Sequence, residues 1–400
     1  MNVYGTWSNG VNSLLNNSYT DPKKFGYYSV KDQLFFSKIE AMECSLRNNS
    51  PISYHYNDDE FLSANWTVEP TKSLSELYQQ RAQQIRDHYD HIVLFYSGGA
   101  DSHNMLESFV SAGIKINEIA SFHSYAADGD QSSSFNREIF ETAIPYVEKL
   151  KKQQLLDINT PHRLIDMSNI IVKFSQDINW LDFPYMANSS VSINNVARAF
   201  LRKYIVEWRD LIDSGKRLCL VWGHDKPRIM HDQKFYLQFL DIFDNCVSTI
   251  NQQTTTPGYF DELFYSTPDL PELVIKQAYT IKNFLETANP EHPFLTEHVT
   301  GLGHVVKHYP DKTYKSFWLT QDAQSYLLYP WFKPELYYEP KPRDIINSKR
   351  DCWFWQDQFI SQKFTSVVAG LVTQFGETWL NISPGSRATK NYRSTRYYIG

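Results

Sequence analysis

The sequence predicts an α/β protein built on a doubly wound parallel sheet, with a mainly helical C-terminal extension. Between about residues 70 and 230, short strand-like runs alternate with longer segments that carry apolar residues at helical spacing. Strands separated by helices pair in parallel through right-handed crossovers. One strand runs directly into a glycine turn, SGGADS at 97–102, and then into a helix. Ligands of open α/β sheets bind at turns of this kind.

The elements of this region follow one another in a regular order. The first is a helix at about 74–89, which begins with a capping box formed by Ser73 and Glu76. The next is a strand at 92–96, rich in β-branched and aromatic residues. The remaining expected elements are a helix at 102–112, a strand at 118–123, a helix at 135–152, a strand at 163–166, a helix within 191–214 and a strand at 218–222.

The flanking segments carry weaker patterns. Residues 1–70 are polar and aromatic, and only 30–47 is compatible with a helix. Beyond residue 230, we expect helices in KFYLQFLDIF (234–243), LPELVIKQAYTIKNFLETA (270–288) and VVAGLVTQFGETWL (367–380). The chain is therefore divided into an N-terminal segment at 1–70, an α/β domain at 71–230 and a mainly helical extension at 231–400.

Composition limits the classes of function. The 400 residues are 42% hydrophobic and carry a net charge of -6, which argues against a broad basic surface for nucleic acid. No apolar run approaches the ~20 residues that cross a bilayer. No pair of cysteines forms CxxC, so a zinc ribbon is excluded and a reducing, cytoplasmic location without membrane association is expected. The four cysteines are Cys44, Cys219, Cys246 and Cys352.

The glycine turn has the residues of an anion-binding loop. Gly98 and Gly99 lack Cβ and can take positive φ, so backbone N–H groups can approach an anion closely. The following helix directs its positive end to the same point, and Ser97 and Ser102 add hydroxyl donors. Asp101 beside an anion implies a divalent cation between them. The expected phosphate-binding residues are Ser97, Gly98, Gly99, Ala100, Asp101 and Ser102.

The simpler alternative is a strand-to-helix turn that tolerates glycine and is capped by Asp or Ser. The motif is neither a Walker loop nor a dinucleotide fingerprint, because GxxxxGK[ST] and GxGxxG are both absent. SGGADS resembles the pyrophosphate loop of the ATP-pyrophosphatase (PP-loop) superfamily, over roughly residues 70–230. This resemblance implies an adenine nucleotide α-hydrolase (HUP-like) fold, ATP and Mg²⁺ as cofactors, and a substrate selected by residues 231–400. Members adenylate a carboxylate, carbonyl or amide oxygen and release pyrophosphate.

A second loop, Gly223-His224-Asp225-Lys226, follows the strand at 218–222. It resembles a loop of asparagine synthetase-like proteins that ends in Asp-Glu, whose aspartate helps to hold magnesium on pyrophosphate. The resemblance implies that Asp101 and Asp225 are the metal ligands and that Gly223 lies at the cofactor. Lys226 departs from the family, which has Glu there, and a lysine can stabilise departing pyrophosphate. The alternative for this loop is a strand-end turn with a helix cap.

Further residues refine the resemblance. The strand at 118–123 lies where the superfamily recognises adenine, which makes Ser121 and His123 candidate cofactor contacts, without a catalytic role for His123. A glutaminase domain is not expected, since Asn2 stands where that domain has its catalytic cysteine and the first cysteine is Cys44. The expected function is an AMP- and pyrophosphate-forming synthetase that activates a carboxylate or amide oxygen for attack by an amine or ammonia.

Two other functions remain open at this point. One is a PP-loop enzyme that modifies RNA or DNA bases and grips a phosphate backbone with its basic tail, although a solvated tail has the same composition. The other is a nucleotide-binding scaffold without turnover, because function resides in the site and not in the fold. The tail residues in question are Arg387, Lys390, Arg393 and Arg396, interleaved with Tyr392, Tyr397 and Tyr398.

Overall fold

A five-stranded parallel sheet forms the centre of the chain, in the strand order β10–β7–β4–β5–β6. Its strands are β4 (His91–Phe95), β5 (Glu118–His123), β6 (His162–Asp166), β7 (Leu218–Trp222) and β10 (Tyr259–Leu263). The computed structural model describes residues 22–123, 138–174, 197–198, 200–224, 226–241, 258–287, 313–314, 321–333, 358–376, 380–383, 386–389 and 391–400. The predicted α/β class is confirmed.

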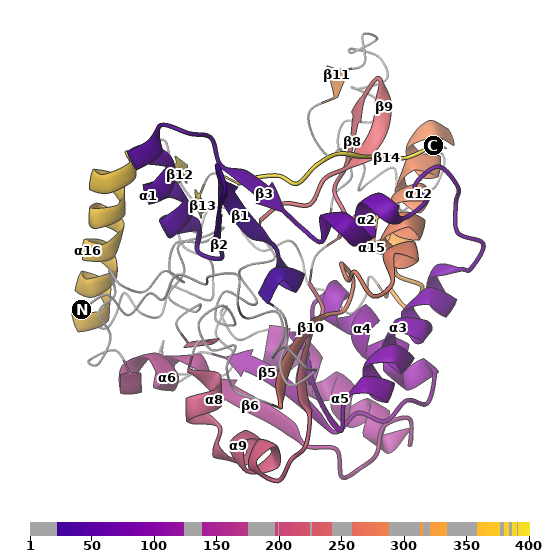
Figure 1. Cartoon of the computed structure of the whole chain (residues 1–400). Helices are drawn as coiled ribbons and strands as arrows, with labels where there is room; N and C mark the ends of the chain where they lie inside the picture. The colour runs from indigo at the N-terminus through magenta and orange to yellow at the C-terminus, as the bar shows by residue number, and fades with distance from the viewer. Residues whose placement is uncertain are drawn as a thin grey trace.

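Helices cover both faces of this sheet (Figure 1). On one side lie α3 (Leu74–His88), α4 (Ala100–Ser111), the π-helical turn η3 (Glu138–Ala143) and α5 (Ile144–Lys152). On the other lie α6 (Met167–Phe174), α8 (Leu201–Tyr204) and α9 (Val206–Asp213). With helices on both faces, the parallel sheet is doubly wound.

The predicted capping box at the start of α3 is present, since the Ser73 hydroxyl accepts from the Glu76 N–H and the Glu76 carboxylate accepts from the Ser73 N–H.

The fifth strand, β10, comes from residues beyond the predicted 71–230 range. All five of its residues, YFDEL, are buried, and Phe260 pairs with Cys219 of β7. Two acidic residues interrupt the apolar run of this strand, so its sequence does not resemble a buried strand. Each acidic side chain has a buried partner. Asp261 accepts a 2.7 Å hydrogen bond from the Trp222 indole, and Glu262 forms a 2.6 Å ion pair with Arg81. Polar groups satisfied in this way can be buried within a strand.

The remaining part of the chain mixes helices with small sheets. The helices α12 (Pro271–Thr287), α15 (Gln321–Leu328) and α16 (Gln358–Phe375) belong to the expected helical extension. The helix predicted at 367–380 begins earlier and ends at Phe375, because Gly376 takes a positive φ of 82° and Leu380 begins a strand. The prediction of a helix at 234–243 was wrong, because β9 (Lys234–Leu237) pairs there with β8 (Ile229–Asp232) and β14 (Tyr397–Tyr398). Gln233, with φ of 62°, reverses the chain between β8 and β9. The other strands are β11 (Thr313–Tyr314), β12 (Leu380–Ser383) and β13 (Ser386–Thr389).

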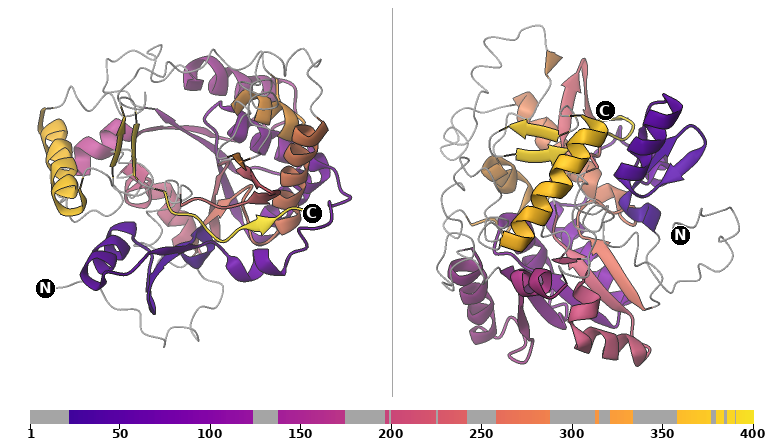
Figure 2. Two further views of the ribbon diagram at one scale, coloured as in Figure 1. Left: turned by 90° about the horizontal axis from the view of Figure 1, so that it is seen from above. Right: turned by 90° about the vertical axis from the view of Figure 1, so that its left-hand side faces the viewer.

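An N-terminal unit packs on this framework. It consists of η1 (Pro22–Phe25), β1 (Tyr27–Val30), β2 (Gln33–Phe35), α1 (Lys38–Asn48), β3 (Ser53–His55) and α2 (Asp58–Ser63), with sheet order β2–β1–β3. The helix expected at 30–47 begins only at Lys38, since β2 pairs with β1 before it. The unit lies beside the C-terminal strand β14 (Figures 1 and 2), where the Phe61 ring of α2 lies 5.9 Å from the Tyr397 ring.

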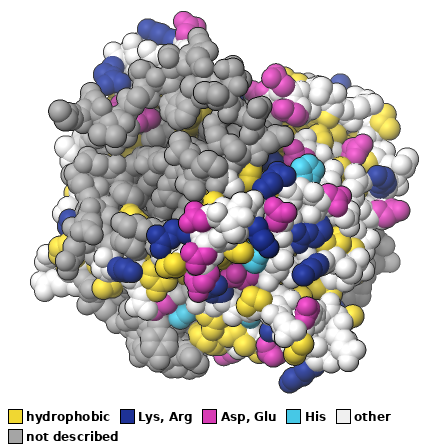
Figure 3. Space-filling view, turned by 60° about the horizontal axis from the view of Figure 1, so that its bottom comes forward, with side chains coloured by type: hydrophobic (Ala, Val, Ile, Leu, Met, Phe, Trp, Pro, Cys, Tyr) yellow, Lys and Arg dark blue, Asp and Glu magenta, His cyan; other side chains and the backbone are white. Residues whose placement is uncertain are grey.

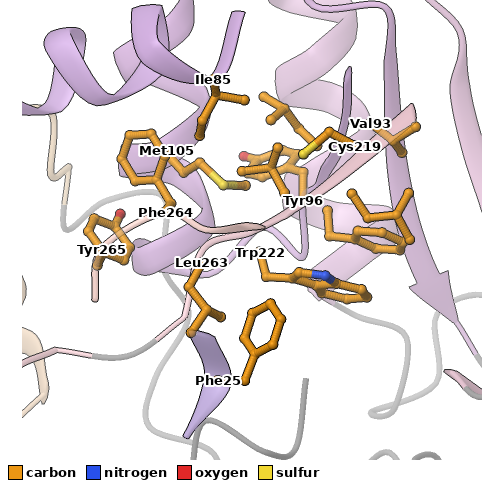
Figure 4. Packing of buried hydrophobic residues seen from close by; sticks show 14 of the residues in the cluster. Phe25, Ile85, Val93, Tyr96, Met105, Cys219, Trp222, Leu263, Phe264 and Tyr265 are labelled. Carbon is orange, nitrogen blue, oxygen red and sulfur yellow. The ribbon is translucent and has the colours of Figure 1, made fainter. Parts of the chain in front are cut away.

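Segments far apart in sequence share one core. Figure 4 shows Phe25, from η1, in the same cluster as Trp222 of β7 and Leu263 of β10. Ion pairs of Lys24 and Lys38 join the N-terminal unit to the rest. Lys24 lies 2.8 Å from Glu262, and Lys38 forms a fully buried 2.6 Å pair with Asp241. The N-terminal unit is therefore an integral part of the fold.

The surface mixes charges of both signs. On the face in Figure 3, basic and acidic side chains are interspersed. Among the helices in the described part of the chain, none is long and apolar enough to cross a membrane.

Candidate functional site

Two predicted loops meet at the point where the sheet changes direction. The chain runs outward from β4 to β5 and β6, then returns to β7 on the other side of β4. The loops after β4 and β7 therefore lie side by side, as the pairing of Phe95 with Trp222 requires. A cavity of about 260 Å³ opens here. It is lined by Ser97, Gly99, Asp101 and Ser102, by Trp222, Gly223 and His224, and by Phe122, His123, Glu138, Met167 and Arg198, among others.

The glycine loop, residues 97–102, is fixed by its own serines and by its contact with η3. Gly98 has a φ of 82°, and a Cβ on it would lie 2.7 Å from the carbonyl oxygen of Glu138, so this position requires glycine. Gly99 has an ordinary φ of -79° and caps α4 without any side-chain hydrogen bond, which leaves first-turn N–H groups for a ligand. The Ser102 hydroxyl accepts from the Ser97 N–H and donates to the Gly99 carbonyl. The two serines thus brace the loop.

Asp101, in the first turn of α4, is bound by groups from three other parts of the chain. Its Oδ1 accepts from the Lys226 ammonium at 2.5 Å and from the Tyr329 hydroxyl at 2.5 Å. Its carbonyl oxygen accepts from the Tyr265 hydroxyl at 2.6 Å. Lys226 is buried, with 3% of its side chain exposed, whereas Asp101 is 34% exposed. The Lys226 Nζ also lies 5.0 Å from the centre of the Tyr329 ring.

These contacts fix the protonation states of the cluster. Burial favours the neutral form of Asp101, but the Lys226 ammonium and the Tyr329 hydroxyl outweigh it and hold the pKa of the carboxyl below its usual value. Burial and the Asp101 charge raise the pKa of Tyr329 well above its usual value. Asp101 is therefore an ionised acceptor, and Tyr329 is a protonated donor.

Of the two predicted magnesium ligands, the structure describes only Asp101. Asp225 lies outside the described residues, so its pairing with Asp101 through a metal stays a prediction. At Asp101 the neighbouring cation is the Lys226 ammonium, which repels a second cation. No group of three or more His, Cys, Asp or Glu residues that could hold a metal occurs within the described ranges.

Gly223 sets the distance between the two loops. A Cβ at this position would lie 3.0 Å from the Ser102 Cα and 3.2 Å from the Asp101 carbonyl oxygen. A larger residue would push the end of β7 away from the start of α4. Because the end of β7 lies close to the start of α4, the side chain of Lys226, three residues after Gly223, can bond Asp101.

Aromatic rings form one wall of the cavity. The rings of Phe95 and Trp222 stack at 3.8 Å with an interplanar angle of 5°, and Phe122 lies 4.9 Å from Phe95. The Arg198 guanidinium lies 6.0 Å from the ring centres of both Phe122 and Trp222. Such a wall suits a planar group of the ligand.

The two adenine candidates on β5 differ in position. His123 lines the cavity, and burial lowers its pKa, opposed by the charge of Asp166, so its ring is neutral near pH 7. Ser121 is buried, with 1% exposure, and its hydroxyl donates to the Tyr96 carbonyl and bonds His162 Nε2 at 2.8 Å. Four of the predicted site residues are not among the described residues that line the cavity: Ser121, Gly98, Ala100 and Lys226.

Several site residues were missed by sequence reasoning. Tyr329 and Tyr265 stand 228 and 164 positions after Asp101, and no local pattern marks them. Arg198 lies in a helix-like segment without a motif. Trp222 could have been predicted as a site residue, because it is the last residue of a strand at the point where the strand order reverses, immediately before Gly223.

The basic tail is part of the fold where it is described. Tyr397 is buried, with 2% exposure, and stacks on Trp66 at 5.0 Å. The Arg396 guanidinium lies 4.6 Å from the centre of the Tyr236 ring. Lys390 lies outside the described residues. Of the tail aromatics, Tyr397 is thus unavailable for stacking on nucleic-acid bases.

Comparisons with known proteins add little. No model of a known protein family matches the chain, and no curated protein sequence matches it. Among solved structures, the chain matches an NMN synthetase from Francisella tularensis with 13% identity and a TM-score of 0.27, over 51% of this chain and 74% of that chain. At this TM-score the match carries no conclusion about the site or its substrate.

Proposed function

We propose that the chain is an ATP-dependent enzyme of the PP-loop type, which cleaves ATP between the α- and β-phosphorus and releases pyrophosphate. One observation carries this proposal. A cavity at the switch point of the sheet is bordered by the uncapped start of α4 and by a glycine loop that requires Gly98, and the buried Lys226 ammonium lies behind that loop on Asp101. Backbone N–H groups with a buried cation behind them favour a polyanion.

The residues suggest how ATP would lie. The pyrophosphate part would bind the loop from Ser97 to Ser102, and the base would point toward the end of β5, near Phe122 and His123. The aromatic wall and Arg198 offer a face for a planar ring. Residues 231–400 would select the acceptor, as the resemblance implies, and the 71–230 domain would be completed by β10.

The proposed reaction is the activation of a carboxylate or amide oxygen, as in asparagine synthetase-like proteins. The acceptor oxygen attacks the α-phosphorus, and the bond from that phosphorus to the bridging oxygen breaks with release of pyrophosphate. An amine or ammonia then attacks the activated carbon, loses a proton to solvent, and AMP leaves. The protein would contribute positioning by the loop and charge stabilisation by Lys226 of the departing pyrophosphate.

The products test the proposal. ATP labelled at the α-phosphorus is incubated with the full chain, ammonia and pools of carboxylic acids, and nucleotides and pyrophosphate are quantified. Formation of AMP and pyrophosphate in equal amounts supports the proposal, whereas ADP and phosphate contradict it. ATP binding without release of pyrophosphate from any pool indicates the non-catalytic scaffold. A requirement for RNA or DNA as the acceptor indicates the nucleic-acid modifying enzyme.

A further inference from the structure

We propose that Lys226 is the resident cation of this site, and that it neutralises Asp101 in place of a divalent metal. Phosphates would then bind the glycine loop without any metal ion held by Asp101. This inference rests on the proposed function, because it assumes that the loop binds the phosphates of ATP. It replaces the magnesium site that the sequence predicts at Asp101 with an organic cation built into the chain.

The charge of Asp101 must be neutralised before a phosphate can bind beside it. A carboxylate in the first turn of α4 would repel a phosphate bound at the same helix end, unless a cation neutralises it. The Lys226 ammonium lies 2.5 Å from Asp101 Oδ1, and 3% of its side chain is exposed. The neutralising charge is therefore already present in the folded chain.

The second step concerns the coordination of Asp101. Each oxygen of a carboxylate has two lone-pair directions, and those of Oδ1 already accept hydrogen bonds from Lys226 and from Tyr329, so a bidentate metal at Asp101 would have to displace a donor. A metal bound through Oδ2 alone would leave these donors in place. It would still lie within a few ångströms of an ammonium in a partly buried site, where like charges repel strongly.

The third step concerns the way in which the lysine is held. Gly223 brings the end of β7 against Asp101 and Ser102, and the chain then reaches Lys226 three residues later. The ring of Tyr329 lies under the ammonium, and the Tyr265 hydroxyl fixes the Asp101 backbone. A cation fixed from several elements is preorganised for an incoming anion.

The test compares nucleotide binding with and without metal. Calorimetry follows the binding of α,β-methylene-ATP, which is not cleaved between these phosphorus atoms, to the full chain in EDTA and in excess Mg²⁺. We expect the wild-type dissociation constants to agree within about threefold. In EDTA, Lys226→Met should weaken binding by at least about tenfold, because Asp101 would then carry a negative charge that no cation neutralises and would repel the phosphates. Lys226→Arg keeps the charge and should weaken binding less.

Control and outcomes separate the two proposals. Lys216 is exposed and precedes β7, at the end of that strand opposite to the loops, so Lys216→Met should bind like the wild type. Wild-type binding in Mg²⁺ that disappears in EDTA would overturn the resident-cation proposal and leave the proposed function standing. Binding under neither condition would overturn the proposed function. If Lys226→Met binds normally in EDTA, the lysine is not the cation. If that variant does not fold, the wild-type comparison and Lys226→Arg decide.

Discussion

Replacement of Gly98 by alanine tests whether the glycine loop is fixed by contact with η3. Gly98 has a φ of 82°, and a Cβ there would lie 2.7 Å from the backbone oxygen of Glu138 and 3.2 Å from the Ala143 nitrogen. These neighbours are backbone atoms, which cannot rotate away as a side chain can. The substitution should therefore displace the loop or η3, and both border the cavity.

The magnitude follows from two separate costs. Positive φ costs an alanine about 1–2 kcal/mol relative to glycine. Overlap with a rigid neighbour adds about 1–3 kcal/mol, so Gly98→Ala should lower the free energy of unfolding by about 2–5 kcal/mol. Gly215 provides a matched control, because its φ is 83° and no atom lies within 4 Å of its Cβ position. Gly215→Ala should pay only the backbone cost of about 1–2 kcal/mol.

Urea unfolding, followed by tryptophan fluorescence, measures both variants. Any effect of alanine on the unfolded chain is similar at the two positions and cancels in the comparison. Gly98→Ala should be less stable than Gly215→Ala by at least about 1 kcal/mol, and it should also bind ATP more weakly. Equal losses of stability in the two variants would refute the argument that η3 constrains the loop.

Three further predictions concern the polar groups of the core. Tyr329→Phe removes a hydrogen bond to the charged Asp101 and should lower the free energy of urea unfolding by about 1.5–3 kcal/mol; an unchanged value would contradict the contact. Lys38→Met leaves the buried Asp241 without its cation, with only the Tyr28 hydroxyl bound to its carboxylate, and should cost about 3–5 kcal/mol. The double variant with Asp241→Leu should recover most of this loss in the same assay. Burial lowers the pKa of His103 from 6.5 to about 4, so the unfolded chain binds more protons than the folded chain between these pH values. The free energy of unfolding should therefore fall by up to about 3 kcal/mol as the pH is lowered from 6.5 to 4. His103→Gln should reduce this pH dependence, and a variant whose stability depends on pH as the wild type does would refute the prediction.

The sheet and the glycine loop could be predicted because their signals are local. The run from His91 to Ser111 contains a buried strand, two glycines and an amphipathic helix within about twenty residues, and β5 and β7 have their predicted bounds. The capping box at Ser73 is equally local. In each case the residues that decide the structure are neighbours in sequence.

The rest depends on contacts between distant residues. The segment after Gln233 has the composition of a helix, yet it forms β9 because β8 and β14 offer partners on both sides. Asp101 beside an anion loop implies a metal from sequence, and this stays a prediction. The described donors to its carboxylate, Lys226 and Tyr329, come from 125 and 228 positions away. Such pairings leave no periodic or local signature.

The edge strand β10 has a consequence for biosynthesis. As the chain emerges from the ribosome, β7 is complete about 40 residues before β10 can pair with it, and until then the fully buried sequence LCLVW presents a free apolar edge. Tyr329 arrives later still, so the hydroxyl that holds Asp101 is among the last parts of the site to be made. A fragment limited to residues 71–230 would keep that edge open permanently and should aggregate, whereas a fragment extended through β10 and Tyr329 closes it.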